Sequence, residues 1–231
     1  ETLIEASAAL SDADRRRAEA LIATLIGERL SKYNLGGANV ADLPTGRRIL
    51  VPGQVEDDAS IRLGATDVTT NHGLLAAARK ANPAAVIIYK PHPDVEAGLR
   101  KGTVSEATSL ADVVATKADP LALIDQVDEV WTMTSLLGFE ALLRGKKVTC
   151  LGSPFYAGWG LTDDRAMPVT RRSASPDVIA LAHAVLIDYP RYFDPKSGLP
   201  CPVEVAVERL ATGDIPRPSQ FNRIAAKLQG A

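Results

Sequence analysis

The chain has 231 residues, 46% of them hydrophobic, which is enough for one large core or two small ones. Its 26 Lys and Arg residues against 28 Asp and Glu give a formal net charge of -2, so global charge favours neither nucleic acid nor an anionic membrane as a partner. Cys150 and Cys201 lack CxxC spacing, which is typical of a reducing compartment. With no long apolar run and no signal-peptide pattern, we predict a cytoplasmic protein that meets a membrane only peripherally.

The predicted elements begin with a helix and continue as alternating strands and helices. Residues 11–34 carry apolar side chains at helical spacing behind a Ser/Asp start. Predicted strands and helices then alternate along the chain. The predicted strands lie at residues 47–53, 84–89, 128–133 and 147–152, and the predicted helices between them at 72–83, 119–127 and 135–146. This order predicts an α/β fold with a Rossmann-like parallel sheet and helices on both faces.

The pattern divides the chain into three segments. Residues 1–45 are predicted as an N-terminal helix and linker, and residues 46–170 as the Rossmann-like domain. Residues 171–231 are predicted as a helical tail that packs on the domain, with helices at 176–193, 202–213 and 218–230 separated by Pro and Gly.

Unusual sequence follows each of the four predicted strands. The segments are GQVEDDAS at 53–60, KPHPD at 90–94, MTSLLGFE at 133–140 and LGSPFYAGWG at 151–160. Ligands of open α/β sheets bind beyond the carboxyl ends of the strands, so we expect these four loops to form one site.

The KPHP segment holds a histidine between two prolines. Proline restricts both its own backbone and that of the preceding residue, so His92 projects from a nearly fixed base that suits a phosphate or a nucleobase. Lys90 could add a point charge for a phosphate. The alternative is a proline-rich turn with a capping histidine.

Hydroxyls and a carboxylate mark the start of the third predicted helix. Thr134 and Ser135 precede its first turn, where free backbone N–H groups bind anions, although an N-cap alone also explains Ser135. Glu140 follows about one and a half turns later. Its carboxylate could accept hydrogen bonds from both hydroxyls of a ribose, or it could be a surface glutamate.

Three adjacent carboxylates follow the first strand, and they could form a solvated turn, a metal site or an acid/base centre. In an extended segment Gln54, Glu56 and Asp58 would share one side, with Asp57 pointing outward.

The segment after the fourth strand concentrates aromatic residues and glycines. Phe155, Tyr156 and Trp159 are expected to surround a close approach of the backbone to a ligand, and a plain packing corner is the alternative.

In this order and spacing, VPGQVEDDASI, YKPHPD, SLLGFEALLRGKKV and LGSPFYAGWGLTDD resemble the KpsC/LipB-type capsule polysaccharide proteins, the retaining β-Kdo glycosyltransferases of Gram-negative bacteria. The likeness covers about residues 32 to 195. It implies a GT-B-like enzyme that transfers Kdo from CMP-Kdo to lysophosphatidylglycerol or a Kdo-primed lipid acceptor at the inner membrane, beside other capsule biosynthesis and export proteins. Because such proteins carry longer modules, this chain is expected to be a nucleotide-binding half that is inactive alone.

The resemblance also implies roles for individual residues. It assigns His92 and Pro93 to the nucleotide, Thr134 and Ser135 to the phosphate, and Glu140 to the ribose. Asp58, or else Glu56, is expected to be catalytic, and the other expected substrate-binding residues are Gln54, Lys90, Tyr156 and Trp159. No metal or cofactor is expected, because fixed donors around the phosphate can stabilise the departing CMP.

Several alternatives stay open at this stage. Retention allows either a nucleophilic carboxylate or a front-face route. A non-catalytic CMP-binding or assembly module of the capsule machinery and a GT-B-like sugar-nucleotide epimerase are the rival functions. Without its second half, the chain is expected to leave Leu21, Leu25 and the helix at 178–186 partly bare.

Overall fold

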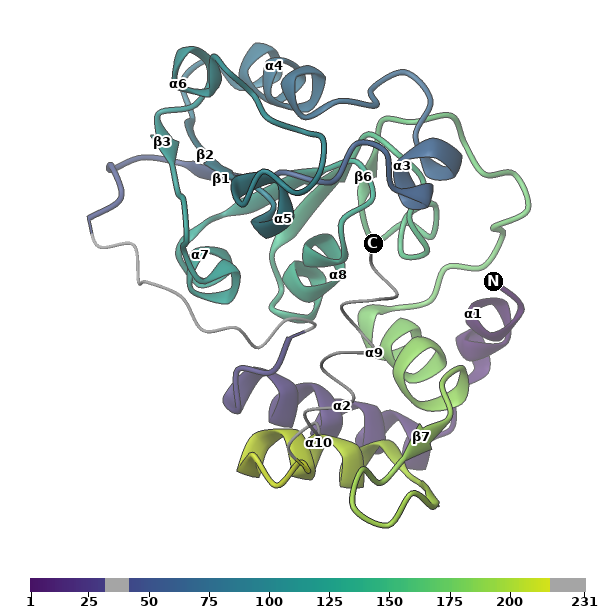
Figure 1. The fold of residues 1–231 in the computed structure, drawn as a ribbon. Coiled ribbons are helices and arrows are strands. Elements are labelled where there is room, and N and C mark those ends of the chain that lie inside the picture. Colours follow the sequence, from purple (N-terminus) through teal and green to yellow (C-terminus); the bar gives the residue numbers. More distant parts are fainter. Residues whose placement is uncertain (32–41, 217–231) are drawn as a thin grey trace.

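The computed structural model describes residues 1–31 and 42–216 and is built around a six-stranded sheet (Figure 1). The strand order is β3-β2-β1-β4-β5-β6, and every neighbouring pair is parallel. The strands are β1 Arg48–Pro52, β2 Val86–Lys90, β3 Val113–Val114, β4 Glu129–Thr132, β5 Lys147–Cys150 and β6 Asp163–Asp164. The Rossmann-like prediction is confirmed.

The four predicted strands form the centre of the sheet, and the two edge strands were not predicted. β3 and β6 have two residues each, which is too short to carry an apolar pattern. The expected segment boundaries at residues 46 and 171 stay predictions.

Helices cover both faces of the sheet. The sheet helices are α3 Ala59–Gly64, α4 Asn71–Ala81, α5 Pro93–Glu96, α6 Ala107–Leu110, α7 Pro120–Gln126 and α8 Leu136–Leu143. Leu50 of β1 points into a core shared with α7 and α8, while Ile49 and Val51 point into a second core shared with α4 and α6. Figure 1 shows these helix pairs on opposite sides of the strands. The alternation of strand side chains therefore supplies both cores.

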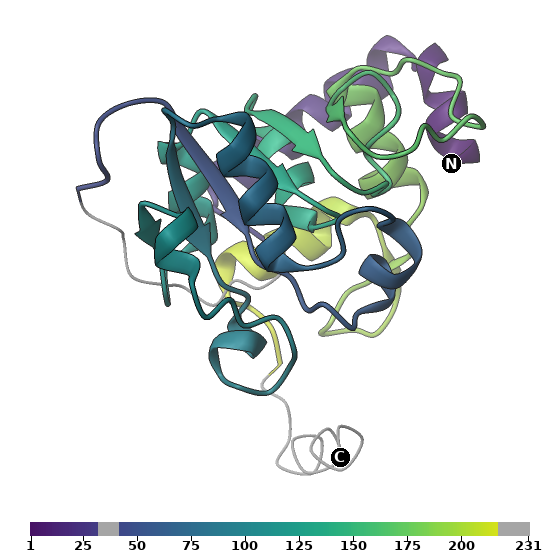
Figure 2. The ribbon, with the colours of Figure 1, turned by 90° about the horizontal axis from the view of Figure 1, so that it is seen from above.

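The two ends of the chain form a helical layer beside the sheet (Figures 1 and 2). Its elements are α1 Thr2–Ala6, the 3₁₀ helix η1 Ser7–Ala9, α2 Asp12–Gly27, α9 Val178–Ala182, the π-helix η2 His183–Asp188, the antiparallel pair β7 Tyr192–Phe193 and β8 Pro200–Cys201, and α10 Val203–Thr212. The segment predicted as one helix at 176–193 is thus divided, and the predicted helix at 218–230 lies outside the described residues.

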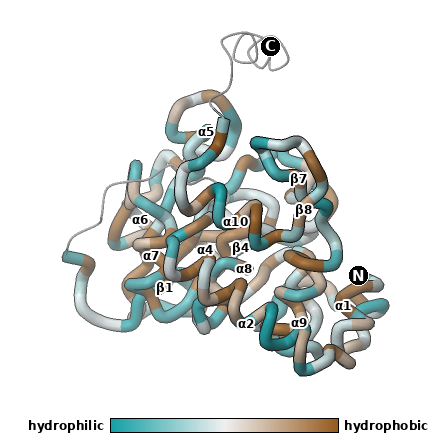
Figure 3. The backbone as a smooth tube through the Cα atoms, turned by 90° about the horizontal axis from the view of Figure 1, so that it is seen from below, coloured by the Kyte–Doolittle hydropathy of each residue, from teal (hydrophilic) through white to brown (hydrophobic). Residues whose placement is uncertain are grey.

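Packing within this layer buries Leu21 and the middle of the segment at 178–186, and leaves Leu25 half-buried. Leu21 of α2 is 4% exposed and packs against Val203 and Val207 of α10, and Leu25 packs against the same cluster. Leu181 of α9 is buried in the core below α8. All five residues of α9 are hydrophobic, whereas hydrophobic and hydrophilic residues are mixed along α2 (Figure 3), as expected for a helix with one buried face. α2 and α10, which lie far apart in the sequence, therefore cover each other.

The aromatic segment after β5 is a packing corner. Trp159 is 2% exposed and donates from its indole N–H to the Phe155 carbonyl. Arg172 lies over the Trp159 ring and donates to the carbonyls of Pro154 and Ala157. Arg172 thus stabilises the segment at 151–160, although it lies twelve residues beyond the end of that segment.

Tyr156 fixes the first turn of α8 from inside the same corner. Its fully buried ring stacks with Phe139, and its hydroxyl donates to the Ser135 carbonyl. Burial raises the pKa of Tyr156 well above its usual value, so the phenol stays a donor at physiological pH. The ring lies directly over Gly138, where there is no room for a side chain.

We predict that Gly138→Ala destabilises the protein. An added Cβ would lie 2.2 Å from the Tyr156 hydroxyl oxygen, and the buried ring cannot move aside. Overpacking of this kind lowers the free energy of unfolding by about 1 to 3 kcal/mol, measurable by chemical denaturation. The control is Gly27→Ala in α2, where a Cβ meets nothing within 4 Å and stability should be unchanged or slightly higher. Equal stability of the two variants would show that the α8 contact yields at little cost.

Candidate functional site

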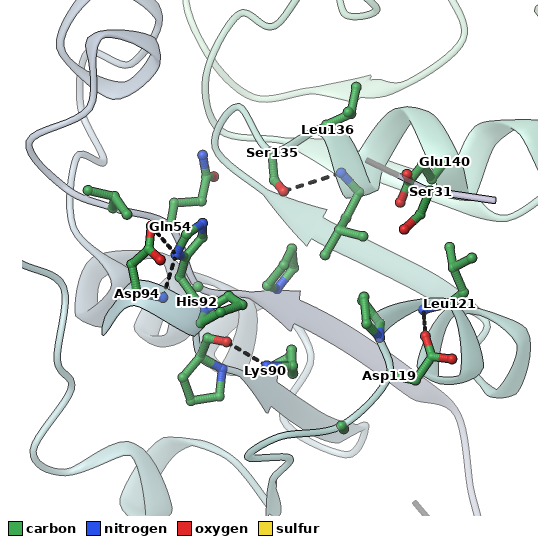
Figure 4. Close-up of a pocket in the computed structure, with 18 of the residues that line it drawn as sticks. Ser31, Gln54, Lys90, His92, Asp94, Asp119, Leu121, Ser135, Leu136 and Glu140 are labelled. Atoms are coloured by element: carbon green, nitrogen blue, oxygen red, sulfur yellow. Dashed lines mark hydrogen bonds and ion pairs between the residues drawn. The ribbon is translucent and has the colours of Figure 1, made fainter. Parts of the chain in front are cut away.

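A cavity of about 1120 Å³ lies beyond the carboxyl ends of the central strands (Figure 4). One wall comes from the loops after β1, β2, β3 and β4, and the other from residues 28–31 after α2 and from the end of α10 with Ile215. The strand order reverses between β1 and β4, so this position is the topological switch point where α/β sheets bind ligands.

Gln54 joins the loops after β1 and β4. Its side-chain oxygen accepts from the Thr132 hydroxyl at 3.1 Å and from the Thr134 backbone N–H at 3.0 Å. Its amide nitrogen donates to the Thr134 hydroxyl at 2.9 Å. Gln54 lines the cavity and is only 6% exposed, and its side chain forms a bridge that holds Thr134 in place. Its contact with a ligand stays a prediction.

Asn71 supports the same loop from behind. It is 1% exposed, accepts from the Gln54 backbone N–H and donates to the carbonyls of Gln54 and Gly102. Gly102 has φ +138, and a Cβ there would lie 2.7 Å from the Asn71 amide nitrogen. The loop around Gly102 can therefore close on Asn71 only because glycine occupies that position.

The three carboxylates after β1 separate because residues 56 and 57 form a turn, so the expected extended conformation is wrong. Glu56 accepts from the Asn71 backbone N–H at 2.7 Å and lies outside the described lining of the cavity. Asp58 caps α3 by accepting from the Ser60 N–H at 2.8 Å, and it lines the cavity. Of the two candidate catalytic carboxylates, only Asp58 faces the cavity.

Asp57 points away from the cavity lining, as predicted. It forms an exposed ion pair with Arg100, with 2.9 Å between Oδ1 and the guanidinium. The hydrogen bond from Arg100 lowers the pKa of the Asp57 carboxyl below its usual value.

His92 combines the two readings of the KPHP segment. Its backbone is extended, as the prolines predict, and its Nδ1 accepts from the Asp94 N–H at 3.2 Å, which makes it the cap of α5. In the neutral ring this cap leaves the proton on Nε2, so that nitrogen is a hydrogen-bond donor. The ring lines the cavity, and Pro93 occupies the first position of α5.

Close packing of the β1 and β2 loops fixes His92 further. A Cβ on Gly53 would lie 3.2 Å from the backbone nitrogen of His92 and 2.8 Å from the Tyr89 hydroxyl oxygen. The absence of a side chain at Gly53 therefore lets the two loops meet.

Lys90 lines the cavity, but a carboxylate already pairs with it. Its ammonium donates to the Pro91 carbonyl at 2.8 Å and to Glu96 at 3.1 Å, and its side chain is 6% exposed. The other Glu96 oxygen accepts from the Lys117 N–H. Lys90 thus stabilises the loop that carries His92. The sequence had suggested a lysine available as a point charge for a phosphate.

The first turn of α8 forms the wall between β1 and β4. Ser135 is its N-cap, as predicted, with its hydroxyl accepting from the Leu137 N–H and its own N–H bonded to Thr132. Glu140 lines the cavity and is 8% exposed, so the surface-glutamate alternative is wrong. In Figure 4, Ser135 lies between Glu140 at one end and Gln54, His92 and Asp94 at the other.

Tyr156 and Trp159, expected to contact substrate, do not reach the described cavity wall. Both are buried in the packing corner, and Tyr156 acts on the cavity only through the Ser135 carbonyl. Their glycine-rich, aromatic sequence is equally compatible with a tight corner and a ligand loop, so the pattern could not separate the two.

The cavity contains charges of both signs. At one end Arg29 binds Asp119 at 3.1 Å and Asp125 at 3.2 Å, and these hydrogen bonds raise the pKa of Arg29. At the other end Arg100 pairs with Asp57. An anion bound between them would depend on directed donors, His92 Nε2 and the first turn of α8, and less on net charge.

Sequence analysis missed several residues of the lining. Asp94, Glu96 and Arg100 follow KPHP and could have been included by extending that motif. Ser31 and Asp119 come from distant elements without any motif, and only the folded chain brings them to the cavity.

The described residues carry neither a cluster of metal ligands nor a helix able to span a membrane. In residues 1–31 and 42–216, no group of three or more His, Cys, Asp or Glu side chains is arranged to hold a metal ion. None of the helices in this part of the chain is both long and apolar enough to cross a bilayer.

Comparison with known sequences gives consistent relatives. Residues 17–192 match the family model of the capsule polysaccharide biosynthesis proteins. The capsule polysaccharide modification protein LipA of Neisseria meningitidis serogroup A is 48% identical over 86% of this chain and 29% of LipA. The lipopolysaccharide-processing protein LpsZ of Rhizobium meliloti is 46% identical over 79% of this chain and 42% of LpsZ. The chain thus spans less than half the length of these relatives.

Solved structures extend the likeness to the fold. The β-Kdo 2,4 transferase of Thermosulfurimonas dismutans KpsC superposes with a TM-score of 0.78 and 33% identity, covering 87% of this chain and 64% of that chain. The β-Kdo 2,7 transferase of the same KpsC gives a TM-score of 0.76 and 35% identity, covering 91% and 65%. The sequence match and the shared fold agree, and this chain belongs to the capsule polysaccharide biosynthesis protein family.

Proposed function

We propose that this chain is the donor-binding half of a retaining β-Kdo glycosyltransferase that uses CMP-Kdo. The observation that carries the proposal is the meeting of His92, the first turn of α8 and Glu140 in one cavity at the switch point. The names of the two similar structures, both β-Kdo transferases, support the choice of sugar.

Each part of the cavity suits one part of CMP. The phosphate is expected between His92 Nε2 and the capped start of α8, where donors are fixed before the ligand arrives. Glu140 is buried about one and a half turns along the same helix, where its carboxylate can accept from both ribose hydroxyls. No bound metal is needed to hold this nucleotide.

The reaction breaks the bond between the sugar's anomeric carbon and the phosphate oxygen, and CMP leaves with the bonding electrons. Positive charge develops on the sugar ring while negative charge grows on the phosphate, so fixed donors at the phosphate lower the barrier. Asp58 is proposed as the carboxylate that attacks the anomeric carbon in a double displacement. A front-face route would instead give Asp58 an electrostatic role at the same position.

Transfer also needs an acceptor site, which we place outside this chain. The chain corresponds to 64% and 65% of the two similar transferase structures, so the remaining part of such a module would supply acceptor contacts and closure of the cleft. We propose that the complete protein acts at the cytoplasmic face of the inner membrane, on lysophosphatidylglycerol or a Kdo-primed lipid, with other capsule proteins.

The test of this function uses the complete protein, CMP-Kdo and product analysis by mass spectrometry, with and without acceptor. Acceptor-dependent elongation by Kdo supports the transferase. A changed sugar nucleotide without acceptor would indicate an epimerase, and CMP binding without turnover would indicate a non-catalytic module; either result overturns the proposal.

We predict that His92→Ala weakens CMP binding by about 1.5 to 3 kcal/mol, the range for a hydrogen bond to a charged group. Calorimetric titration of the 231-residue chain measures this effect, and UMP should bind less well than CMP because groups placed for cytosine would lose partners. His72→Ala is the control, since His72 is exposed on α4 and lies outside the described lining. Equal CMP affinity of His92→Ala and the unmodified chain would contradict the prediction.

We predict that Asp58→Asn in the complete protein lowers Kdo transfer by orders of magnitude and leaves fold and CMP binding intact. Asparagine caps helices as well as aspartate does, so α3 keeps its start, but the amide is neither nucleophile nor base. Matched variants are Glu56→Gln and Asp57→Asn, and Asp57→Asn should matter least because it points outward. Full turnover in Asp58→Asn with loss in Glu56→Gln would move the catalytic role to Glu56.

A further inference from the structure

Arg100 lies at the His92 end of the cavity. After α5 the chain turns back, and the backbone N–H groups of Leu99 and Arg100 donate to the Asp94 carbonyl at 2.8 and 3.2 Å. The Arg100 side chain lines the cavity and is 43% exposed. This turn therefore fixes the backbone position of Arg100, while its guanidinium group stays accessible from the cavity.

Of the other Lys and Arg side chains in the described lining, Lys117 is an exposed point charge, whereas Lys90 and Arg29 are already paired with carboxylates. Lys90 is 6% exposed beneath Pro91 and Glu96. Arg29 is bonded to two carboxylates, one of them Asp119, which Figure 4 shows at the Glu140 end. Arg100 forms an ion pair with Asp57, which is itself 49% exposed.

The proposed nucleotide position determines where the sugar must lie. CMP-Kdo has a single phosphate, so nucleoside and sugar extend from opposite sides of it. With the ribose at Glu140 and the phosphate at Ser135 and His92, the sugar extends toward the end where Figure 4 shows Asp94. The backbone hydrogen bond to Asp94 places Arg100 beside it.

The sugar brings a charge to that end of the cavity. Kdo carries a carboxylate on its anomeric carbon, next to the bond that breaks. Asp58 and Asp94 of the lining would repel it, and guanidinium is the side-chain group whose paired donors match a carboxylate. An exposed ion pair contributes little stability, so Arg100 can exchange one carboxylate for another at small cost.

We propose that Arg100 recognises the donor sugar's carboxylate, and that Asp57 occupies this place on the guanidinium until the donor binds. Arg100 is then the residue that selects an acidic sugar nucleotide, a role distinct from holding CMP. This inference rests on the proposed function, because the direction of the sugar follows from the proposed position of CMP.

The test compares CMP with CMP-Kdo as ligands of the same chain. Calorimetric titration of Arg100→Gln should give an affinity for CMP within about twofold of the unmodified chain and an affinity for CMP-Kdo at least about tenfold lower. Lys101→Gln is the matched control, because it removes a neighbouring exposed charge that lies outside the described lining. It should leave both affinities unchanged.

Asp57→Asn separates ligand recognition from a role in holding the loop. If Asp57 only pairs with the Arg100 guanidinium until the donor binds, then Asp57→Asn leaves the affinity for CMP-Kdo equal or higher. If the ion pair positions the loop, Asp57→Asn weakens CMP-Kdo as much as Arg100→Gln does, and the inference is wrong. Equal losses for CMP and CMP-Kdo in Arg100→Gln, or no loss at all, also overturn it. Failure of the unmodified chain to bind CMP would instead overturn the proposed function beneath it.

Discussion

The candidate site depends on the amide of Gln54, which spans the carboxyl ends of β1 and β4. Its oxygen and nitrogen together make three hydrogen bonds to Thr132 and Thr134, across the point where the strand order reverses. Because the group is buried, loss of the Thr134 hydroxyl would remove the acceptor of its amide nitrogen, and leaving a buried polar atom unsatisfied costs about 1 to 3 kcal/mol. The bridge thereby holds the start of α8 against the loop after β1, and Asn71 holds that loop from behind.

This construction gives an anion site made of directed donors. Tyr156 holds the Ser135 carbonyl on the core side of α8, while the cap of α5 sets which nitrogen of His92 carries the proton. Carboxylates pair with two of the cations that line the cavity, Lys90 and Arg29. Donors that need not reorganise suit a leaving group whose negative charge grows during the reaction. The acidic surroundings in turn make a cation such as Arg100 necessary for an acidic sugar.

Much of the fold and part of the site follow from local sequence. Apolar runs of buried strands, the Ser135 cap and the extended backbone at His92 depend on residues close together in the chain, and all three predictions are confirmed. Edge strands of two residues carry no such pattern and were missed. Three of the four motifs located loops of the cavity correctly because parallel strands bring their carboxyl ends to one edge, whereas the segment at 151–160 lies outside the described lining.

The sequence by itself therefore determined the Rossmann-like class, the edge that carries the site and the residue types found there. Tertiary structure decided the strand order, the separation of Glu56 from Asp58, the pairing of Lys90 with Glu96 and the burial of Tyr156. It also covered Leu21 with a helix from the other end of the chain. Each of these outcomes depends on a contact made only after the chain has folded, such as Asn71 to Glu56 or Tyr156 to Ser135, and no local spacing rule specifies which distant group will be the partner.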